Sequence, residues 1–134
     1  MGHGNFESQM VPKQIAALAG CRVVAVEAGY RHSLMVTAGG KLYSCGNNKH
    51  GPLGHCVKEN RAVPTEVEVL EDVVSAAVGG SEMRYGQEHS LLRTRTGAVF
   101  SWGFGANGTL GHGDKADRRL QMQLGLLWDA QVGF

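Results

Sequence analysis

The sequence contains an internal repeat, and this repeat limits the folds open to the chain more than any other feature. The first version is AGYRHSLMVTAGGKLYSCGNNKHGPLGHC, at residues 28–56, and the second is EHSLLRTRTGAVFSWGFGANGTLGHG, at residues 88–113. Equivalent residues lie 57 positions apart: His32 and His89, Gly46 and Gly103, Gly51 and Gly108, and Gly54 and Gly111. A long match in a fixed register predicts one structural unit that the chain uses more than once.

The repeat extends in both directions from this match. Upstream, VVAVEAG at 23–29 aligns with VVSAAVG at 73–79 at a spacing of 50, so seven residues have been inserted before His89. MGHG at the start of the chain aligns with LGHC at 53–56. We therefore predict the tail of a preceding repeat at 1–20, a first full repeat at 21–72, a second repeat at 73–119 with an inserted loop at 80–88, and a divergent tail at 120–134.

Each unit has the pattern of three or four short antiparallel strands. HSLMVTA and KLYSC alternate in side-chain type across Gly39-Gly40, which predicts a hairpin whose two turn residues both need positive φ. VVAVEA and VVSAAV are apolar enough for inner, largely buried strands. PTEVEVL, which begins at Pro64, alternates cleanly and suits an outer strand with one wet face.

The glycines at 103–108 have the G-x-G-x-x-G spacing of a dinucleotide-binding loop. Such a loop needs a helix directly after it, but TLGHGD follows here and cannot start one. The first copy, GNNKHG, lacks the middle glycine, so the repeat does not need Gly105. We predict structural turns at Gly46, Gly51, Gly54, Gly103, Gly108 and Gly111, and keep a nucleotide-binding protein as an alternative.

The amino-acid composition limits the kinds of partner that the chain can bind and the cellular compartment that we expect for it. Net charge is +1, with 13 Lys and Arg against 12 Asp and Glu, which argues against direct nucleic-acid binding. No apolar run reaches the length of a membrane span, and the first residues lack the layout of a signal peptide. Three cysteines give no disulfide framework, so we expect the cytosol or the nucleus.

The sequence predicts neither catalytic residues, nor a metal, nor a cofactor. Cys45, His50, His55 and Cys56 resemble a zinc site in composition only. Cys45 aligns with Trp102, and His55 aligns with histidines that have no cysteine beside them, so a core thiol and a turn histidine explain them better. No Ser, His and Asp set suggests a nucleophile, and we expect the chain not to be an enzyme.

The motifs, taken in order, resemble a known family. G-x-x-H-S-L, then GKLYSCG or GAVFSWG, then G-x-L-G-H-G is similar to the repeat of the regulator of chromosome condensation family, over residues 1 to about 119. The resemblance implies an all-β fold, a partial β-propeller of two four-stranded antiparallel blades plus the end of a preceding one. It also implies a protein-interaction module, with guanine-nucleotide exchange on a Ran-type small GTPase as the leading specific activity.

The resemblance and the insertion each suggest partner-binding residues. In the founding exchange factor of this family, polar groups of the loops before the G-x-x-H histidine reach the GTPase, which points here to Arg31, His32, Glu88 and His89. The inserted loop carries Arg84 and Tyr85, residue types that are enriched at interface hot spots. The alternatives are a histidine that fixes its own turn through a backbone carbonyl and a surface loop without a partner.

Two repeats leave apolar surface uncovered, because each repeat buries its apolar face only against its neighbours. We therefore expect this chain to form part of a larger propeller or to self-associate. The remaining alternative is a truncated propeller fragment with no independent activity.

Overall fold

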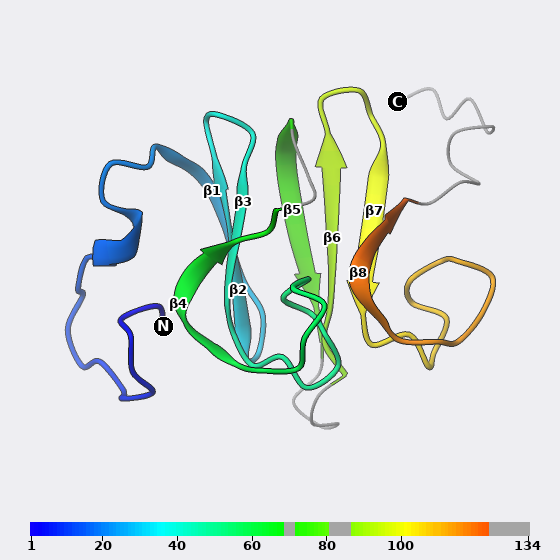
Figure 1. Ribbon diagram of the computed structural model, residues 1–134, viewed down its shortest axis with the longest axis horizontal. Helices are drawn as coiled ribbons and strands as arrows, with labels where there is room; N and C mark the ends of the chain where they lie inside the picture. Colours follow the sequence, from blue (N-terminus) through cyan, green and yellow to red (C-terminus); the bar gives the residue numbers. More distant parts are fainter. Residues whose placement is uncertain (69–71, 81–86, 124–134) are drawn as a thin grey trace.

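The structure consists of two four-stranded antiparallel sheets (Figure 1). It is a computed structural model that describes residues 1–68, 72–80 and 87–123. The first sheet has the order β1 (Val23–Ala28), β2 (His32–Thr37), β3 (Leu42–Gly46) and β4 (Arg61–Glu66). The second has the order β5 (Val73–Gly79), β6 (His89–Thr94), β7 (Val99–Gly103) and β8 (Arg118–Gln123). A short 3₁₀ helix, η1 (Ala16–Leu18), precedes β1. The predicted all-β class is confirmed.

The two sheets repeat the same register. His32 pairs with Gly46 in the first sheet, and His89 pairs with Gly103 in the second. The pairing of both first strands also shifts register at the same place, between Val23 and Ala25 in β1 and between Val73 and Ser75 in β5. The sequence offsets of 57 and 50 are therefore offsets between equivalent places in space.

The hairpin turns differ from the prediction in one respect. Gly40 has a φ of 80°, but Gly39 is not among the positive-φ residues. The amide of Gly40 donates to the carbonyl of Thr37 at 3.0 Å, and the amide of Thr37 donates to Lys41 at 2.9 Å. This is a three-residue loop that ends in one left-handed glycine, so only the last position requires positive φ.

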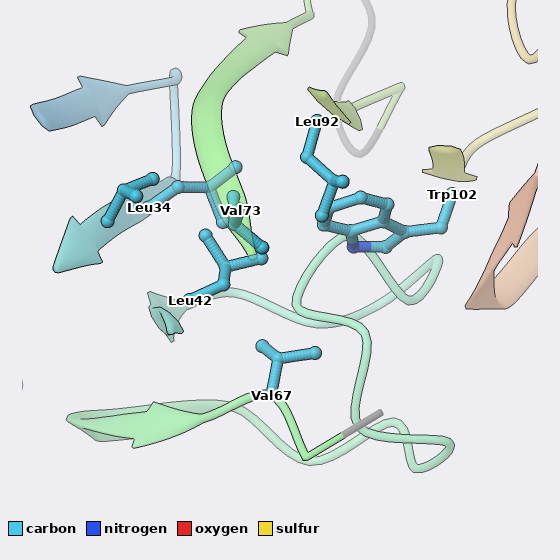
Figure 2. Close-up of a cluster of buried hydrophobic side chains, with 7 residues drawn as sticks. Leu34, Leu42, Val67, Val73, Leu92 and Trp102 are labelled. Atoms are coloured by element: carbon cyan, nitrogen blue, oxygen red, sulfur yellow. The ribbon is translucent and has the colours of Figure 1, made fainter. Parts of the chain in front are cut away.

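The apolar core lies between the two sheets. Its fully buried members are Leu34, Val36, Leu42, Val67, Val73, Leu92 and Trp102. Figure 2 shows the side chains from the two sheets meeting in this layer. Burying one such side chain contributes about 1.5–3 kcal/mol, so the contact between the sheets stabilises both of them.

The prediction that both first strands are largely buried is wrong for β1. Val24 and Val26 are 56% and 68% exposed, because they lie on the face of β1 that points away from β5. β5 is mostly half-buried, since β1 and β2 pack against it. The burial of a strand depends on whether sheets pack against one or both of its faces, and the sequence of the strand does not show which of these applies.

The outer strands β4 and β8 lie at the edges of their sheets, as predicted for the segment containing Pro64. β4 begins at Arg61, three residues before the expected start. β8 runs to Gln123, so the predicted repeat boundary at 119 falls inside this strand. Backbone pairing with β7 continues there although Gln121 replaces the proline of the first repeat.

The glycine-rich segment after β7 leads through turns into β8, with no helix after it. The repeat pattern does not need a glycine at 105, but the second repeat itself does, because a Cβ there would clash with the carbonyl oxygen of Ala116. Asn48 holds the equivalent place in the first repeat and is completely buried.

Within the described ranges, no helix is long and apolar enough to cross a membrane.

Candidate functional site

Glu88 joins the second sheet to the first at the end where β2 and β6 begin. Its carboxylate oxygen Oε1 accepts a hydrogen bond from the backbone amide of Arg31 and lies 3.2 Å from Nδ1 of His32. Glu88 and His32 are both 2% exposed. A carboxylate that accepts two hydrogen bonds in a buried place forms a directional contact, which fixes how one sheet sits on the other.

Ser90 and Trp102 extend this contact. Nε2 of His32 lies 3.0 Å from the hydroxyl of Ser90, and that hydroxyl donates to the carbonyl of Pro52 at 2.8 Å. The indole Nε1 of Trp102 donates to the same carbonyl at 2.7 Å. Both lone pairs of the Pro52 oxygen are thus used, and a buried loop of the first sheet is held by two side chains of the second.

The ring of His32 is held at both of its nitrogens. Nδ1 donates to Glu88, because a carboxylate can only accept, and Nε2 shares a hydrogen bond with the hydroxyl of Ser90. We name this set of residues, His32, Glu88, Ser90, Trp102 and the carbonyl of Pro52, the inner latch.

A second polar contact joins the sheets near their outer edges. Nδ1 of His50 lies 2.9 Å from Oδ2 of Asp117, while Oδ1 of Asp117 accepts from the amide of Gly105 at 2.9 Å. The ring of His50 also meets the ring of Phe104 edge to face, with centroids 5.2 Å apart. We name the pair His50 and Asp117 the outer latch. It is half-exposed, so it contributes less than the inner one.

The histidine of each G-H motif fixes its own sheet. Nε2 of His55 lies 2.9 Å from the hydroxyl of Ser44, which donates to the carbonyl of Leu53 at 2.8 Å. His112 makes the same contact with Ser101, also at 2.9 Å. Burial lowers the pKa of His55, and the positive charge of Arg61 acts in the same direction. The lowered pKa favours the neutral imidazole at this contact with Ser44.

The six predicted turn glycines all have positive φ: Gly46, Gly51, Gly54, Gly103, Gly108 and Gly111. Gly46 and Gly103 also lie where no side chain fits. A Cβ on Gly46 would lie 2.3 Å from the carbonyl oxygen of Arg31, and one on Gly103 would lie 2.6 Å from that of Glu88. These close approaches bring the loop before each histidine against the end of the third strand.

The predicted partner-binding residues have different surroundings. His32 and Glu88 are buried between the sheets, and the side chain of Arg31 is exposed beside them. His89 is half-buried, and its pKa is lowered by burial and by the nearby charge of His32. Arg84 and Tyr85 lie outside the described residues.

Sequence reasoning missed Ser90, Pro52 and Trp102 as members of the contact. One signal could have pointed to the first of these, because a serine follows the histidine in both repeats. Nothing local marks a proline carbonyl as the acceptor.

The four residues weighed as a zinc site lie in separate environments. Cys45 is buried in β3, Cys56 is exposed, and the ring nitrogens of His55 and His50 face Ser44 and Asp117. Within the described part of the chain, no three His, Cys, Asp or Glu side chains gather around one point.

Comparison with known proteins decides the family. The model described as "Regulator of chromosome condensation (RCC1) repeat" matches residues 1–36, 39–81 and 96–126. The chain belongs to the RCC1-repeat family. Each of its four-stranded sheets is therefore a propeller blade, and the predicted partial β-propeller is confirmed.

Curated relatives and solved structures agree with this assignment. The chain is 34% identical to the ultraviolet-B receptor UVR8 of Arabidopsis thaliana over 118 residues, and 40% identical to human Protein RCC2 over 110 residues. These matches cover 88% and 79% of this chain, but 26% and 20% of the relatives. The chain thus spans about a quarter or less of their length.

Two solved structures show the same arrangement of strands. The structure of Prp20p from Saccharomyces cerevisiae, reported with its binding properties to Gsp1p and histones, superimposes with a TM-score of 0.66 at 25% identity. Human WBSCR16 superimposes with a TM-score of 0.59 at 34% identity. Each match covers 78% of this chain and 26% of the other.

Proposed function

We propose that this RCC1-repeat module binds a protein partner through the end of the blades where β2 and β6 begin. The loops 29–31, 47–60 and 104–117 all lie at this end (Figure 1). At the opposite end, the described residues form the tight hairpins at 38–41 and 95–98, with Arg22 and Asp72 hydrogen-bonded beside them. Loops on a rigid sheet scaffold are where binding residues concentrate.

One observation carries the proposal, namely the surface around Arg31. Its guanidinium carbon lies 5.4 Å from the centroid of the Tyr30 ring. A cavity of about 460 Å³ lies beside it, lined by Phe6, Asn47 and Asn60 among others. Arginine and tyrosine are the residue types enriched at interface hot spots, and here both are exposed, with the arginine beside the cavity. We keep His89 and the undescribed Arg84 and Tyr85 as further contact candidates.

The specific activity that we propose is guanine-nucleotide exchange on a Ran-type small GTPase, which would need a rigid surface and no covalent chemistry. The reported binding of Prp20p to Gsp1p supports it. We propose no catalytic residue and no cofactor of the chain's own, and the cytosol or the nucleus remains a prediction from its cysteines.

The test measures release of a fluorescent guanine nucleotide from Ran in the presence of the chain, with binding followed separately by interferometry. We expect faster release, and we expect Arg31→Ala to weaken binding at least tenfold. Arg95→Ala is the matched control, because Arg95 is exposed at the opposite end. Binding without faster release would refute exchange and leave an interaction module. Equal binding by both variants would refute the assignment of this end.

A further inference from the structure

Among the residues that the structure describes, nothing covers the face of the second blade that is equivalent to the buried face of the first. We call it the open face. Leu34 and Leu42 are completely buried against the second blade. Their equivalents Leu91 and Val99 are only half-buried, and they line a shallow cavity of about 180 Å³ together with Arg93. The way in which the first blade's face is covered therefore shows what the open face requires.

The inner latch defines the first requirement. His32 receives a carboxylate from the residue that directly precedes the next blade's histidine, Glu88. The open face offers His89 at the place of His32. A blade that covers it must bring an acceptor to the same point. Its serine at the place of Ser90 reaches only Nε2, so without that acceptor Nδ1 of a half-buried ring is sealed off without a hydrogen-bond partner.

A second copy of this chain does not meet the requirement. The residue of its first blade that corresponds to Glu88 is Arg31, whose side chain has donors only. Cys45 replaces Trp102, so the indole hydrogen bond is lost as well.

The first blade's own outward face is also partly covered. The amide of Gly4 donates to the carbonyl of Ala62 in β4 at 3.0 Å, and a Cβ on Gly2 would lie 3.1 Å from Pro64. Residues 1–4 align with residues 110–113. In a head-to-tail pair, the segment 110–113 of one copy would compete with residues 1–4 of the other for the same place.

We propose that the open face of β5–β8 accepts a further blade of the same repeat, one that carries a carboxylate directly before its His-Ser strand, and that it rejects a second copy of this chain. The carboxylate oxygen accepts from the ring of His89 and from the backbone amide of Glu88, as Glu88 does with His32 and Arg31. The acidic residue is the specificity determinant, because apolar surface alone does not distinguish one blade from another. This inference concerns the contact between blades and is independent of the protein partner proposed above.

The first test adds a blade of the required type. In this chain, residues 67–123 are repeated directly after Gln123, so that the added copy of Glu88 faces His89. We expect the midpoint of thermal unfolding to rise by about 5 °C or more at equal protein concentration. Glu88→Arg in the added copy alone mimics the first blade of this chain, and we expect it to remove most of that rise.

A spectroscopic measurement separates the latch from general stabilisation. We expect the Nδ1 proton of His89 to become slow to exchange in the three-blade chain, and to remain fast in the arginine control. An added blade that gives no rise, or an arginine control as stable as the glutamate chain, would overturn the proposal.

The second test asks whether the unmodified chain pairs with itself. Sedimentation velocity of the wild type is compared with Leu91→Glu, which places a charge on the open face. We expect the two to sediment alike. Oligomers of the wild type that Leu91→Glu abolishes would show that a second copy occupies the face, and would overturn the proposal.

Discussion

Removal of the Glu88 carboxylate should strongly destabilise the contact between the blades. Glu88→Ala leaves the amide of Arg31 and the ring Nδ1 of His32 without their acceptor in a buried place. A buried donor left unpaired costs about 1–3 kcal/mol, so for these two donors we expect a loss of about 2–6 kcal/mol in the free energy of unfolding. Glu88→Gln keeps an oxygen for the amide of Arg31 but loses the charge, so we expect about 1–2 kcal/mol.

Equilibrium unfolding in urea measures both variants. Trp102 is completely buried and donates to Pro52 across the contact, so its fluorescence reports separation of the blades. Trp128→Phe in all variants leaves Trp102 as the only tryptophan. If Glu88→Ala fails to fold, the milder Glu88→Gln still gives a value.

A double-mutant cycle tests the reasoning itself. Glu88 and His32 in direct contact should show a coupling energy of about 0.5–3 kcal/mol. Glu59→Ala, at an exposed glutamate, is the control and should stay within about 0.5 kcal/mol of the wild type. Zero coupling, or a Glu88→Ala variant as stable as the Glu59→Ala control, would refute the latch.

Three further predictions follow from burial, charge and backbone geometry. Exposed Cys56 should react with iodoacetamide at neutral pH much faster than Cys45, because burial raises the pKa of the Cys45 thiol; equal labelling would contradict its burial. Since the pKa of His55 is lowered from 6.5 in the folded chain, its contribution to stability should be complete above about pH 6.5 and fall as the pH drops below it. Urea unfolding from pH 7.5 to 5.5 checks this, and His55→Asn should flatten the dependence. Gly103→Ala should lower the free energy of unfolding by more than about 2 kcal/mol, because the added Cβ meets a backbone carbonyl. Gly97→Ala places its Cβ in open space and should lower it by about 1 kcal/mol, because an alanine is strained at positive φ; urea unfolding measures both variants.

The repeat was readable from the sequence because the signals that define it are local. Strands such as β2 and β6 alternate their side chains, and left-handed turn positions favour glycine wherever they occur. Equal offsets between the two copies then required equal structures. The all-β class and the order of strands within each blade followed without knowledge of how the blades pack.

The residues that meet between the blades could not be predicted from local sequence signals. His32 and Glu88 were predicted as candidates for partner contact, and the structure places both in the buried layer between the sheets. Neither residue's neighbours in sequence show that a carboxylate and an imidazole 56 positions apart will meet. The exposure of β1 also escaped prediction, because its apolar sequence is the same whether or not another blade covers it.

The sequence by itself thus determined the repeating four-stranded unit, its strands and its turns. The tertiary structure alone decided which polar groups of neighbouring units satisfy one another and which face stays open. The physical reason is that strand alternation and turn geometry act within a few residues, while burial and hydrogen bonding across a blade contact depend on the distances that packing sets.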